Sequence, residues 1–488
     1  MIRWPAPVVA LTAAERFGLE LLVDLSRLVP MEDAAADVVA VEVVDGGERT
    51  PDLRSLAAGG WGMEPGDGVV RVPRTALAMV TEIAGAAAEQ RSEARDPHDR
   101  VPSAENALAA AGLEREPVVS LGANSLREAV LRAAGRRAVR LVEPWPEGRR
   151  WAAAFTHDLD VVALWPVFAG ARWLELARKR EARHLMDAAL AAVRAAPGDP
   201  VLAGLRWLLG LERSLSIHST WFVLCGTPTR RTVAAGDLTY RPESRRARAA
   251  LHDIAAGGHE IGLHGSFATM ESAEEFSAQR KRLRTIAGKR PDGVRQHFLR
   301  MRPGATQRAM SAAGFRYDAT YGFPDRNGFR LGVADVVPSW DAEHQRPAGL
   351  DEAPLVWMDR ALSKYRGIED PGAWVDDALA LADACQSLEG LWVGLWHPNL
   401  TPALGYPGAP ASYERLARTI ATRKPYVATL GQLTSWRAAR RAVRAVRIAP
   451  DGSVIAAARA EPSNTYELPS SPLVLEDLSG KRREPVQS

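Results

Sequence analysis

Four segments of this 488-residue chain place ionisable side chains directly after runs of apolar residues. In chain order these side chains are Asp158 and Asp160 in "AAAFTHDLD", His264 in "HEIGLHGS", Arg295 and His297 in "GVRQHFL", and His397 in "LWVGLWHP". Two carboxylates separated by one residue raise each other's pKa in a dry pocket, because like charges repel. A divalent cation removes this conflict when it binds one carboxylate and leaves the other as a base. Imidazole is a natural co-ligand for zinc or a similar ion.

Together these groups favour hydrolysis of an ester or an amide. A bound metal lowers the pKa of a water molecule and polarises a carbonyl oxygen. The second carboxylate removes the proton of the water, and a histidine across the pocket returns a proton to the leaving group. The residue types therefore predict a metal-assisted hydrolase.

Each residue taken alone also has an ordinary structural explanation. Asp158 or Asp160 could cap a helix that follows the strand. His264 could be a hydrogen-bonded loop histidine, His297 a core histidine, and His397 part of a turn. These explanations would have to hold independently at four strand ends, so a shared site is the better interpretation.

The elements that must position these residues are strands and helices that alternate from about residue 151 onward. Strands are predicted at 216–226, 259–266, 292–299 and 391–398, and helices at 244–258, 272–288, 306–314 and 371–388. Such alternation indicates βα units and a mainly parallel sheet or barrel. In barrels of this kind the site forms at the carboxyl ends of the strands, which is where the polar residues cluster.

The length of the chain predicts two or three domains. Residues 1–145 are Ala-rich and are expected to form an N-terminal α/β domain of unknown role. Residues 150–430 contain the predicted barrel, and 432–488 a basic helix, "WRAARRAVRAVR" (436–447), with a small β appendage. Such basic runs are predicted to be solvated helix faces.

Composition narrows the class of protein. Hydrophobic residues make up 46% and charged residues 25% of the chain, as is typical of a soluble globular protein. With 62 basic and 59 acidic residues the formal net charge is only +3, so no nucleic acid partner is expected. Cys225 and Cys385 are too few for a disulfide framework and are expected to be free thiols.

The N-terminal residues do not follow the pattern of a signal peptide, and charged residues interrupt every apolar stretch before about 18 residues. We therefore expect a cytoplasmic protein without a membrane span. The sequence does not indicate an oligomeric state.

The same four segments resemble motifs of the polysaccharide deacetylase superfamily, also called the NodB-homology or carbohydrate esterase 4 group. "FTHDLD" (155–160) is similar to its first motif, "GHEIGLHGSF" (258–267) to its second, "GVRQHFL" (293–299) to its third and "LWVGLWHP" (391–398) to its last. The resemblance covers about 150–430 and is closest to a divergent branch with the T-H-D-x-D form. That branch also shows stretches like "LDEAPLVWMD" (350–359).

The resemblance implies a deformed (β/α)7 TIM-like barrel, a divalent metal, commonly zinc, and hydrolysis of N-acetyl or O-acetyl groups on sugars. The enzyme class would be a hydrolase of carbon–nitrogen bonds other than peptide bonds. Asp158 is similar to the family's catalytic base and Asp160 to its metal-binding aspartate. His264 matches the first histidine of the second motif, Arg295 the arginine that orients the base, and His397 the general acid.

One position departs from the family pattern. The second motif usually carries another histidine four residues after the first, and here that position is Ala268. His297 lies two residues beyond Arg295, so both side chains point the same way on an extended strand. His297 is therefore the candidate for the third metal ligand, and His157 is the second choice.

Two functional hypotheses follow. The first is a deacetylase, or a related amidase or esterase, for an intracellular carbohydrate or glycoconjugate. The second is a catalytically silent barrel that binds glycan, or an interaction module; Ala268 favours the silent barrel. Arg330 could hold an anionic or hydroxyl-rich substrate or simply pin its loop. Trp396 is the best-placed tryptophan for stacking on a sugar, but most tryptophans are core residues, and a core position is the favoured interpretation.

Overall fold

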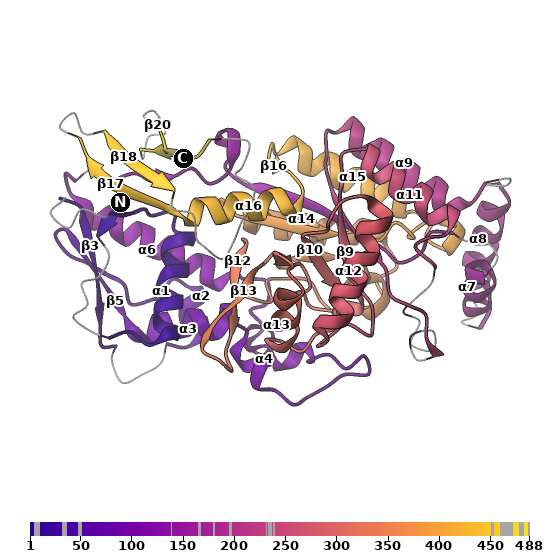
Figure 1. The fold of residues 1–488 in the computed structure, drawn as a ribbon, viewed down its shortest axis with the longest axis horizontal. Helices are drawn as coiled ribbons and strands as arrows, with labels where there is room; N and C mark the ends of the chain where they lie inside the picture. Colours follow the sequence, from indigo (N-terminus) through magenta and orange to yellow (C-terminus); the bar gives the residue numbers. More distant parts are fainter. Residues whose placement is uncertain are drawn as a thin grey trace.

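The structure is a computed structural model of the chain. It describes residues 1–3, 10–31, 37–46, 51–137, 139–163, 167–178, 181–194, 198–230, 232, 237, 240–449, 453–458, 472–477 and 483–486. Figure 1 shows the N-terminal region at one end of the elongated molecule and the predicted barrel at the other.

A curled, open sheet occupies the centre of the predicted barrel. Its strand order is β12-β13-β11-β10-β9-β8-β7-β15-β14, and β16 pairs with β7. The strands are β7 (Ala152–Leu159), β8 (Thr220–Leu224), β9 (Glu260–Gly265), β10 (Gly293–Gln296), β11 (Tyr317–Asp318), β12 (Val337–Asp341), β13 (Arg346–Glu352), β14 (Trp357–Met358), β15 (Leu391–Leu395) and β16 (Tyr426–Val427). All neighbours are parallel except β12 and β13. The predicted mainly parallel α/β sheet is therefore confirmed.

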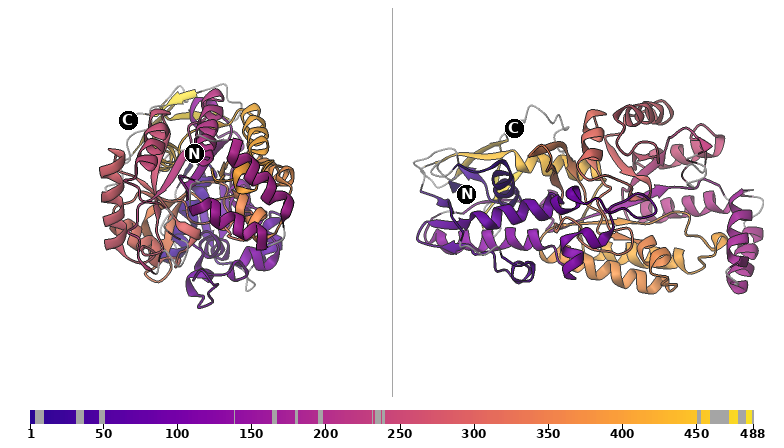
Figure 2. Two further views of the ribbon diagram at one scale, coloured as in Figure 1. Left: turned by 90° about the vertical axis from the view of Figure 1, so that its right-hand side faces the viewer. Right: turned by 90° about the horizontal axis from the view of Figure 1, so that it is seen from below.

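Helices cover the outside of this sheet, as the end-on view in Figure 2 shows. They are α7 (Val167–Arg178), α8 (Ala182–Arg194), α9 (Pro200–Ser214), α11 (Arg245–Ala256), α12 (Ala273–Ala287), α13 (Ala305–Ala312), α14 (Pro371–Ser387), α15 (Ala409–Thr422) and α16 (Leu430–Arg441). The helices α7 and α8 project from the body at the end far from the N-terminus (Figure 1). No helix in the described ranges has the length and apolar composition needed to cross a bilayer.

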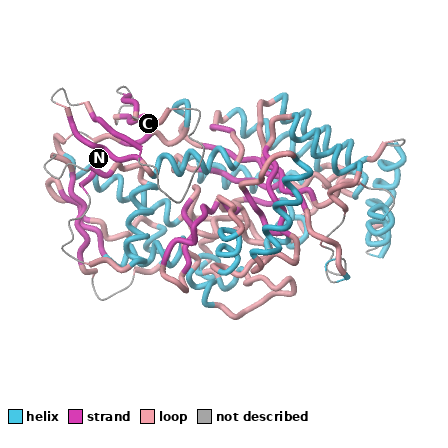
Figure 3. Tube along the Cα trace, viewed as in Figure 1, coloured by secondary structure: helices cyan, strands magenta, loops and turns pink. Residues whose placement is uncertain are grey.

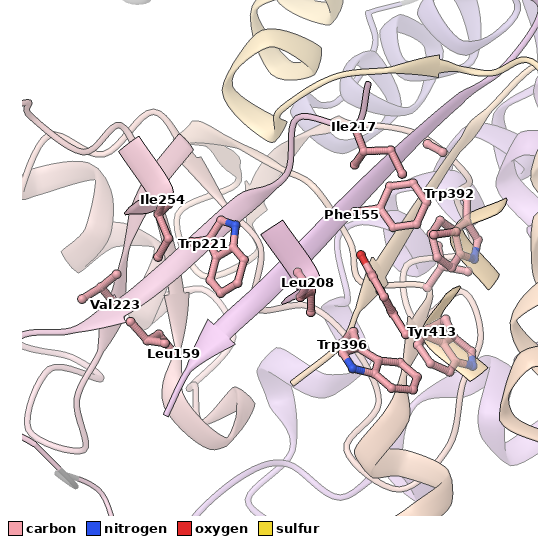
Figure 4. Packing of buried hydrophobic residues seen from close by; sticks show 14 of the residues in the cluster. Phe155, Leu159, Leu208, Ile217, Trp221, Val223, Ile254, Trp392, Trp396 and Tyr413 are labelled. Carbon is pink, nitrogen blue, oxygen red and sulfur yellow. The ribbon is translucent and has the colours of Figure 1, made fainter. Parts of the chain in front are cut away.

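The strand β7 is buried along its whole length because both of its faces are covered. Phe155 on its outer face packs edge-on against Trp392 and Tyr413, with ring centroids 5.6 and 6.4 Å away. Figure 4 shows this cluster continuing through Trp221 and Leu208. On the inner face Ala152 and Ala154 belong to a separate apolar cluster. The alternation of faces therefore decides which polar residues reach the inside of the barrel.

A second, seven-stranded sheet forms the N-terminal region, with the order β18-β17-β2-β1-β3-β5-β4. Its strands are β1 (Ile2–Arg3), β2 (Pro30–Met31), β3 (Val39–Val44), β4 (Glu64–Pro65), β5 (Val69–Pro73), β17 (Val443–Ile448) and β18 (Val454–Ala458). The accompanying helices are α1 (Ala13–Leu25), α2 (Leu53–Ala57), α3 (Arg74–Ala84), α4 (Ala87–Arg91), α5 (Ala107–Ala111) and α6 (Val118–Ala134). Figure 3 shows these strands grouped apart from those of the barrel.

The C-terminal residues differ from the expectation of a separate β appendage. The predicted helix over 436–447 ends at Arg441, and β17 and β18 extend the N-terminal sheet through β2. A third, small sheet joins β19 (Val474–Glu476) and β20 (Arg483–Pro485) to β6 (Leu141–Val142). Residues 459–471, part of the predicted appendage, lie outside the described residues. The three-part domain division itself stays a prediction.

The basic helix α16 is not a solvated face in its middle turns. Arg437 is fully buried and donates to Asp335 Oδ1 at 2.6 Å and to Asp24 Oδ1 at 3.1 Å. Asp24 lies in α1, so these ion pairs fasten the C-terminal helix between the N-terminal region and the barrel. The prediction of a solvated face is wrong here because the arginines find buried carboxylates.

Arg330 connects the N-terminal region to the barrel in a similar way. Its side chain is 1% exposed, as is that of Glu89 in α4. Its Nε donates to both carboxylate oxygens of Glu89, at 3.1 and 3.2 Å, and its Nη1 donates to the carbonyl of Gly322 at 2.7 Å. Of the two explanations for Arg330, the structure supports the one in which it pins its loop.

We expect Glu89→Gln to lower the stability of the protein strongly, because it leaves the buried charge of Arg330 without a counter-ion. The loss should be about 3–5 kcal/mol, measured from the urea dependence of circular dichroism. The matched control is Glu82→Gln, which removes the exposed ion pair with Arg91 and should cost less than about 1 kcal/mol. Equal effects of the two substitutions would contradict a structural role for the buried pair.

Candidate active site

The polar residues at the strand ends meet on the inner side of the curled sheet. The strands β7, β8, β9 and β10 are neighbours, and the register sets Arg295 beside His264. Side chains alternate between the two faces along β7, so Asp158 points to the same inner face as Ala154. Asp158, Asp160, His297 and His397 line one cavity of about 650 Å³. The structure thus brings together the residues assigned to the proposed catalytic and metal-binding roles, which are Asp158, Asp160, His264, Arg295, His297 and His397.

Three of these residues form a group with metal-ligand geometry. One ligand atom each of Asp160, His264 and His297 lies within 4.8 Å of the other two. Oδ1 of Asp160 is 3.4 Å from Nε2 of His264 and 3.6 Å from Nε2 of His297. Two imidazoles and one carboxylate are a donor set that suits zinc or a similar divalent ion.

Hydrogen bonds on the far side of each imidazole fix its orientation. Nδ1 of His264 donates to the carbonyl oxygen of Arg295 at 2.9 Å. Nδ1 of His297 donates to Oδ1 of Asp237 at 2.7 Å, and Asp237 is fully buried. Because Nδ1 is engaged in each case, the Nε2 atom of each ring faces Asp160. Metal-binding histidines are usually oriented in this way.

The residues present therefore fit a divalent cation. The buried Nε2 of His264 makes no hydrogen bond within the described part of the chain, which is costly for a polar atom. Burial lowers the pKa of His264, but the carboxylates of Asp158 and Asp160 raise it above its usual value overall. The carboxylates thus favour a positive charge at this position, and a metal ion would supply it.

Asp160 carries the negative charge at the centre of the site. Burial, the largest single influence, would raise its pKa. The facing imidazoles of His264, His297 and His397 outweigh burial and hold the pKa of Asp160 below its usual range. Asp160 is therefore an anion that can bind a cation at neutral pH.

Asp158 is held by the buried guanidinium of Arg295. Nη1 of Arg295 donates to Oδ1 of Asp158 at 2.9 Å and to Oγ1 of Thr156 at 3.0 Å. Nε of Arg295 donates to the carbonyl of Ala319 at 2.9 Å. The other oxygen of Asp158, Oδ2, faces Nε2 of His264 at 3.5 Å. Asp158 thus lies beside the metal-ligand group but is anchored separately from it.

His397 stands on another side of Asp160. Its Nε2 is 3.7 Å from Oδ2 of Asp160, and its Nδ1 donates to Oδ1 of Asp359 at 2.6 Å. The backbone N–H of His397 donates to Oδ2 of the same Asp359 at 2.6 Å. Burial lowers the pKa of His397, but Asp359 raises it above its usual value overall. The imidazole is therefore suited to hold a proton for donation.

The alternative ligand His157 lies on the outer face of β7. Its Nδ1 bonds the carbonyl of Trp396 and its Nε2 bonds Glu212, both at 2.8 Å. It does not reach the group around Asp160 because successive strand residues point to opposite faces. Ala268, at the position of the usual second histidine, is solvent-exposed in the loop after β9.

The interpretation of Trp396 as a sugar platform is wrong. Its side chain is 4% exposed and belongs to the main apolar cluster, where it stacks on Trp357 with ring centroids 6.1 Å apart. Just beyond the end of β15, Trp396 packs into the core, whereas its neighbour His397 lines the cavity.

Sequence reasoning missed several residues that the site depends on. Asp237 and Asp359 orient histidines from segments outside the four motifs. Arg100, from the N-terminal region, also lines the cavity and donates to the hydroxyl of Tyr365 at 3.2 Å. The sequence signal for Asp359 was the stretch "LDEAPLVWMD" (350–359), which ends at this residue. Asp237 and Arg100 belong to no comparable motif.

Comparisons with known proteins give similarity only at the level of solved structures. No family model matches the chain, and no match was found among the curated proteins. A candidate polysaccharide deacetylase from Mycobacterium smegmatis is 21% identical over 65% of this chain and 96% of its own, with a TM-score of 0.42. One from Pseudomonas aeruginosa PAO1 is 17% identical over 60% and 92%, with a TM-score of 0.40.

The chitin deacetylase from the fungal pathogen Colletotrichum lindemuthianum is 13% identical over 65% of this chain and 96% of its own, with a TM-score of 0.31. Other solved structures to which this chain is similar are described as the peptidoglycan deacetylase PdaC from Bacillus subtilis and as a CE4 family pseudoenzyme from Bacillus anthracis.

Proposed function

We propose that this protein is a metal-dependent hydrolase that removes an acyl group, first of all an acetyl group, from a carbohydrate or glycoconjugate. In this proposal Asp160, His264 and His297 hold a divalent metal, with zinc the first choice. Asp158 is the base, Arg295 its orienting residue and His397 the general acid. The proposed place of action is the cytoplasm. A deformed (β/α)7 barrel of the NodB type accounts for the curled, mainly parallel sheet.

One observation carries this proposal: the buried Nε2 of His264 has no hydrogen-bond partner within the described residues and faces Asp158 and Asp160. A site built only for stability would pair such an atom, since an unsatisfied buried polar group costs about 1–3 kcal/mol. A cation bound by His264, Asp160 and His297 would satisfy it.

The chain's own residues account for both proton transfers. A divalent metal at this site would supply Lewis acidity and lower the pKa of a bound water. Asp158, held by Arg295 at 2.9 Å, is the carboxylate positioned to take a proton from the attacking water. Because Arg295 is itself anchored by Thr156 and Ala319, the carboxylate keeps one orientation through the reaction.

His397 is the group suited to protonate the leaving amine or alcohol. Asp359 bonds both its Nδ1 and its backbone N–H, so the Nε2 proton faces the cavity. The carboxylate of Asp359 also favours the charged imidazolium, as in other histidines that are oriented by a buried acid. Base and acid thus come from different strands, β7 and the end of β15.

The silent-barrel alternative draws on Ala268, which leaves the usual second motif without its second histidine. His297 answers this objection, because it lies in the group around Asp160 and has its own orienting carboxylate, Asp237. A barrel that only binds glycan has no need for a base, an orienting arginine and an acid together.

We expect His297→Ala to weaken zinc binding by at least about 100-fold and Asp237→Asn by about 10–100-fold, because the first removes a ligand and the second its orienting acid. Zinc affinity would be measured by competition with a chromogenic chelator. The matched control is His344→Ala, which disrupts a second group that could hold a metal ion, made of the buried Asp341 and the exposed Glu343 and His344. Loss of zinc from the control variant, or full affinity in His297→Ala, would refute the proposed ligand set.

We expect Asp158→Asn to lower kcat/KM for acetate release by about 10²–10⁴-fold, while the metal content of the purified protein is unchanged. Acetate release from N-acetylglucosamine and its phosphates, with and without chelator, is the measurement. Asp160→Asn should instead lose metal and activity together. The assignment of base and ligand would be reversed if Asp158→Asn lost the metal and Asp160→Asn kept it.

A further inference from the structure

Arg360 lies in the wall of the active-site cavity, and the side chains to which it donates hydrogen bonds are neutral. Its Nη1 donates to the hydroxyl of Tyr406 at 2.9 Å, and its Nη2 donates to Oδ1 of Asn399 at 3.1 Å. Asn399 and Tyr406 line the same cavity. Within the described ranges no carboxylate oxygen lies within 4.0 Å of its guanidinium nitrogens. Its charge is therefore oriented but not neutralised by contact.

The other N–H groups of Arg360 remain available to a ligand, because a guanidinium carries five donors in a planar fork. This fork matches the oxygens of a carboxylate or a phosphate, which it binds in a bidentate way. The two neutral acceptors fix the plane of the fork before any ligand arrives. Such preorganisation reduces the entropy lost on binding.

A second cation of the same segment lines the cavity without a carboxylate contact among the described residues. Lys364 is exposed, and its Nζ lies 5.5 Å from the centre of the Tyr365 ring. The third cation of the wall, Arg100, differs because Asp96 binds it at 2.6 Å. Arg100 is thus used to position Tyr365, whereas Arg360 and Lys364 make no ion pair with a carboxylate of the described residues, and Asp359 and Asp160 act on Arg360 only from a distance.

Acidic residues of the rim do not cancel these charges by contact. Glu175 and Glu369 line the cavity from exposed positions and form no ion pair with Arg360 or Lys364, and Glu181 is paired with His184 at 3.3 Å. Arg360 directly follows Asp359, which holds the candidate acid His397. An anion bound by Arg360 would therefore lie near the reacting end of the cavity.

We propose that Arg360, supported by Lys364, forms an anion subsite, so that the substrate is an acylated sugar with an anionic substituent, a phosphate or a carboxylate. The part of this inference that makes the substrate an acylated sugar rests on the proposed function. The part that gives the substrate a negative charge rests on Arg360, Asn399, Tyr406 and Lys364. If Arg360 only offset the charges of Asp359 and Asp160, its removal would affect neutral and anionic substrates alike.

The decisive measurement compares kcat/KM for N-acetylglucosamine, N-acetylglucosamine 1-phosphate and N-acetylmuramic acid at one ionic strength. The wild-type protein should prefer at least one anionic sugar by about 10–100-fold, the range expected for hydrogen bonds to a charged group. The two anionic sugars separate phosphate from carboxylate recognition. Equal values for all three sugars would overturn the subsite.

Arg360→Gln should bring the ratio of kcat/KM for the anionic sugar to kcat/KM for the neutral sugar close to one, because the contact that depends on the substrate's charge is lost. Lys364→Gln should reduce the preference by about two- to fivefold, as for an exposed charge. Arg418→Gln, which breaks an exposed pair with Glu414 outside the cavity, is the matched control and should leave it unchanged. An equal fall for neutral and anionic sugars in Arg360→Gln would refute the subsite.

A binding experiment separates failure of the subsite from failure of the proposed function. Isothermal titration of the Asp158→Asn protein with the same three sugars needs no turnover. The subsite is supported if an anionic sugar binds more tightly than the neutral sugar, if Arg360→Gln abolishes this difference and if Arg360→Lys retains part of it. This holds even if the wild type shows no hydrolysis. Hydrolysis without any charge preference in binding would leave the proposed function standing and overturn the subsite.

Discussion

The structure depends on one electrostatic constraint: the carboxylates of Asp158 and Asp160 share a buried pocket with three imidazoles. Burying charged groups costs desolvation free energy, so such groups remain buried only if each has a partner that bonds it and fixes its orientation. Arg295 performs this role for Asp158, and Asp359 for His397. The pocket is therefore a set of ionisable groups, most of them held in place by a buried partner on the side away from the cavity.

This constraint explains why the N-terminal region and the barrel are fastened so firmly. The carbonyl of Ala319 that receives the Nε–H of Arg295 begins the loop that carries Gly322 and Arg330. Arg330 in turn is bound by Glu89 of the N-terminal region. The orientation of the candidate base thus depends, through Arg295, on a loop that another part of the chain secures. The N-terminal region thus contributes to the geometry of the candidate site through Glu89.

The sequence predicted what depends on local pattern and missed what depends on distant packing. Strand and helix alternation predicted the parallel sheet. Arg295 and His297 both reach the aspartates of the site as predicted, although β10 ends at Gln296 and His297 begins a 3-10 helix instead of continuing the strand. The strand β17 was missed because "RAVRAVRI" (441–448) also fits a basic helix, and only pairing with β2 makes it a strand. Asp237 and Arg360 lie in segments without periodicity, so nothing in the sequence linked them to the site.

The outer face of β7 shows how the chain makes such a site rigid. His157, which precedes the candidate base, bonds Glu212 and the carbonyl of Trp396 on the side away from the cavity. Glu212 also accepts from Ser219 at 2.7 Å and from Tyr413, so it is fully satisfied although it is buried. Leucines would pack this face at lower desolvation cost, but they would allow the strand to shift. Directional bonds hold the strand in one position, and because Asp158 is the next residue, they hold the carboxylate as well.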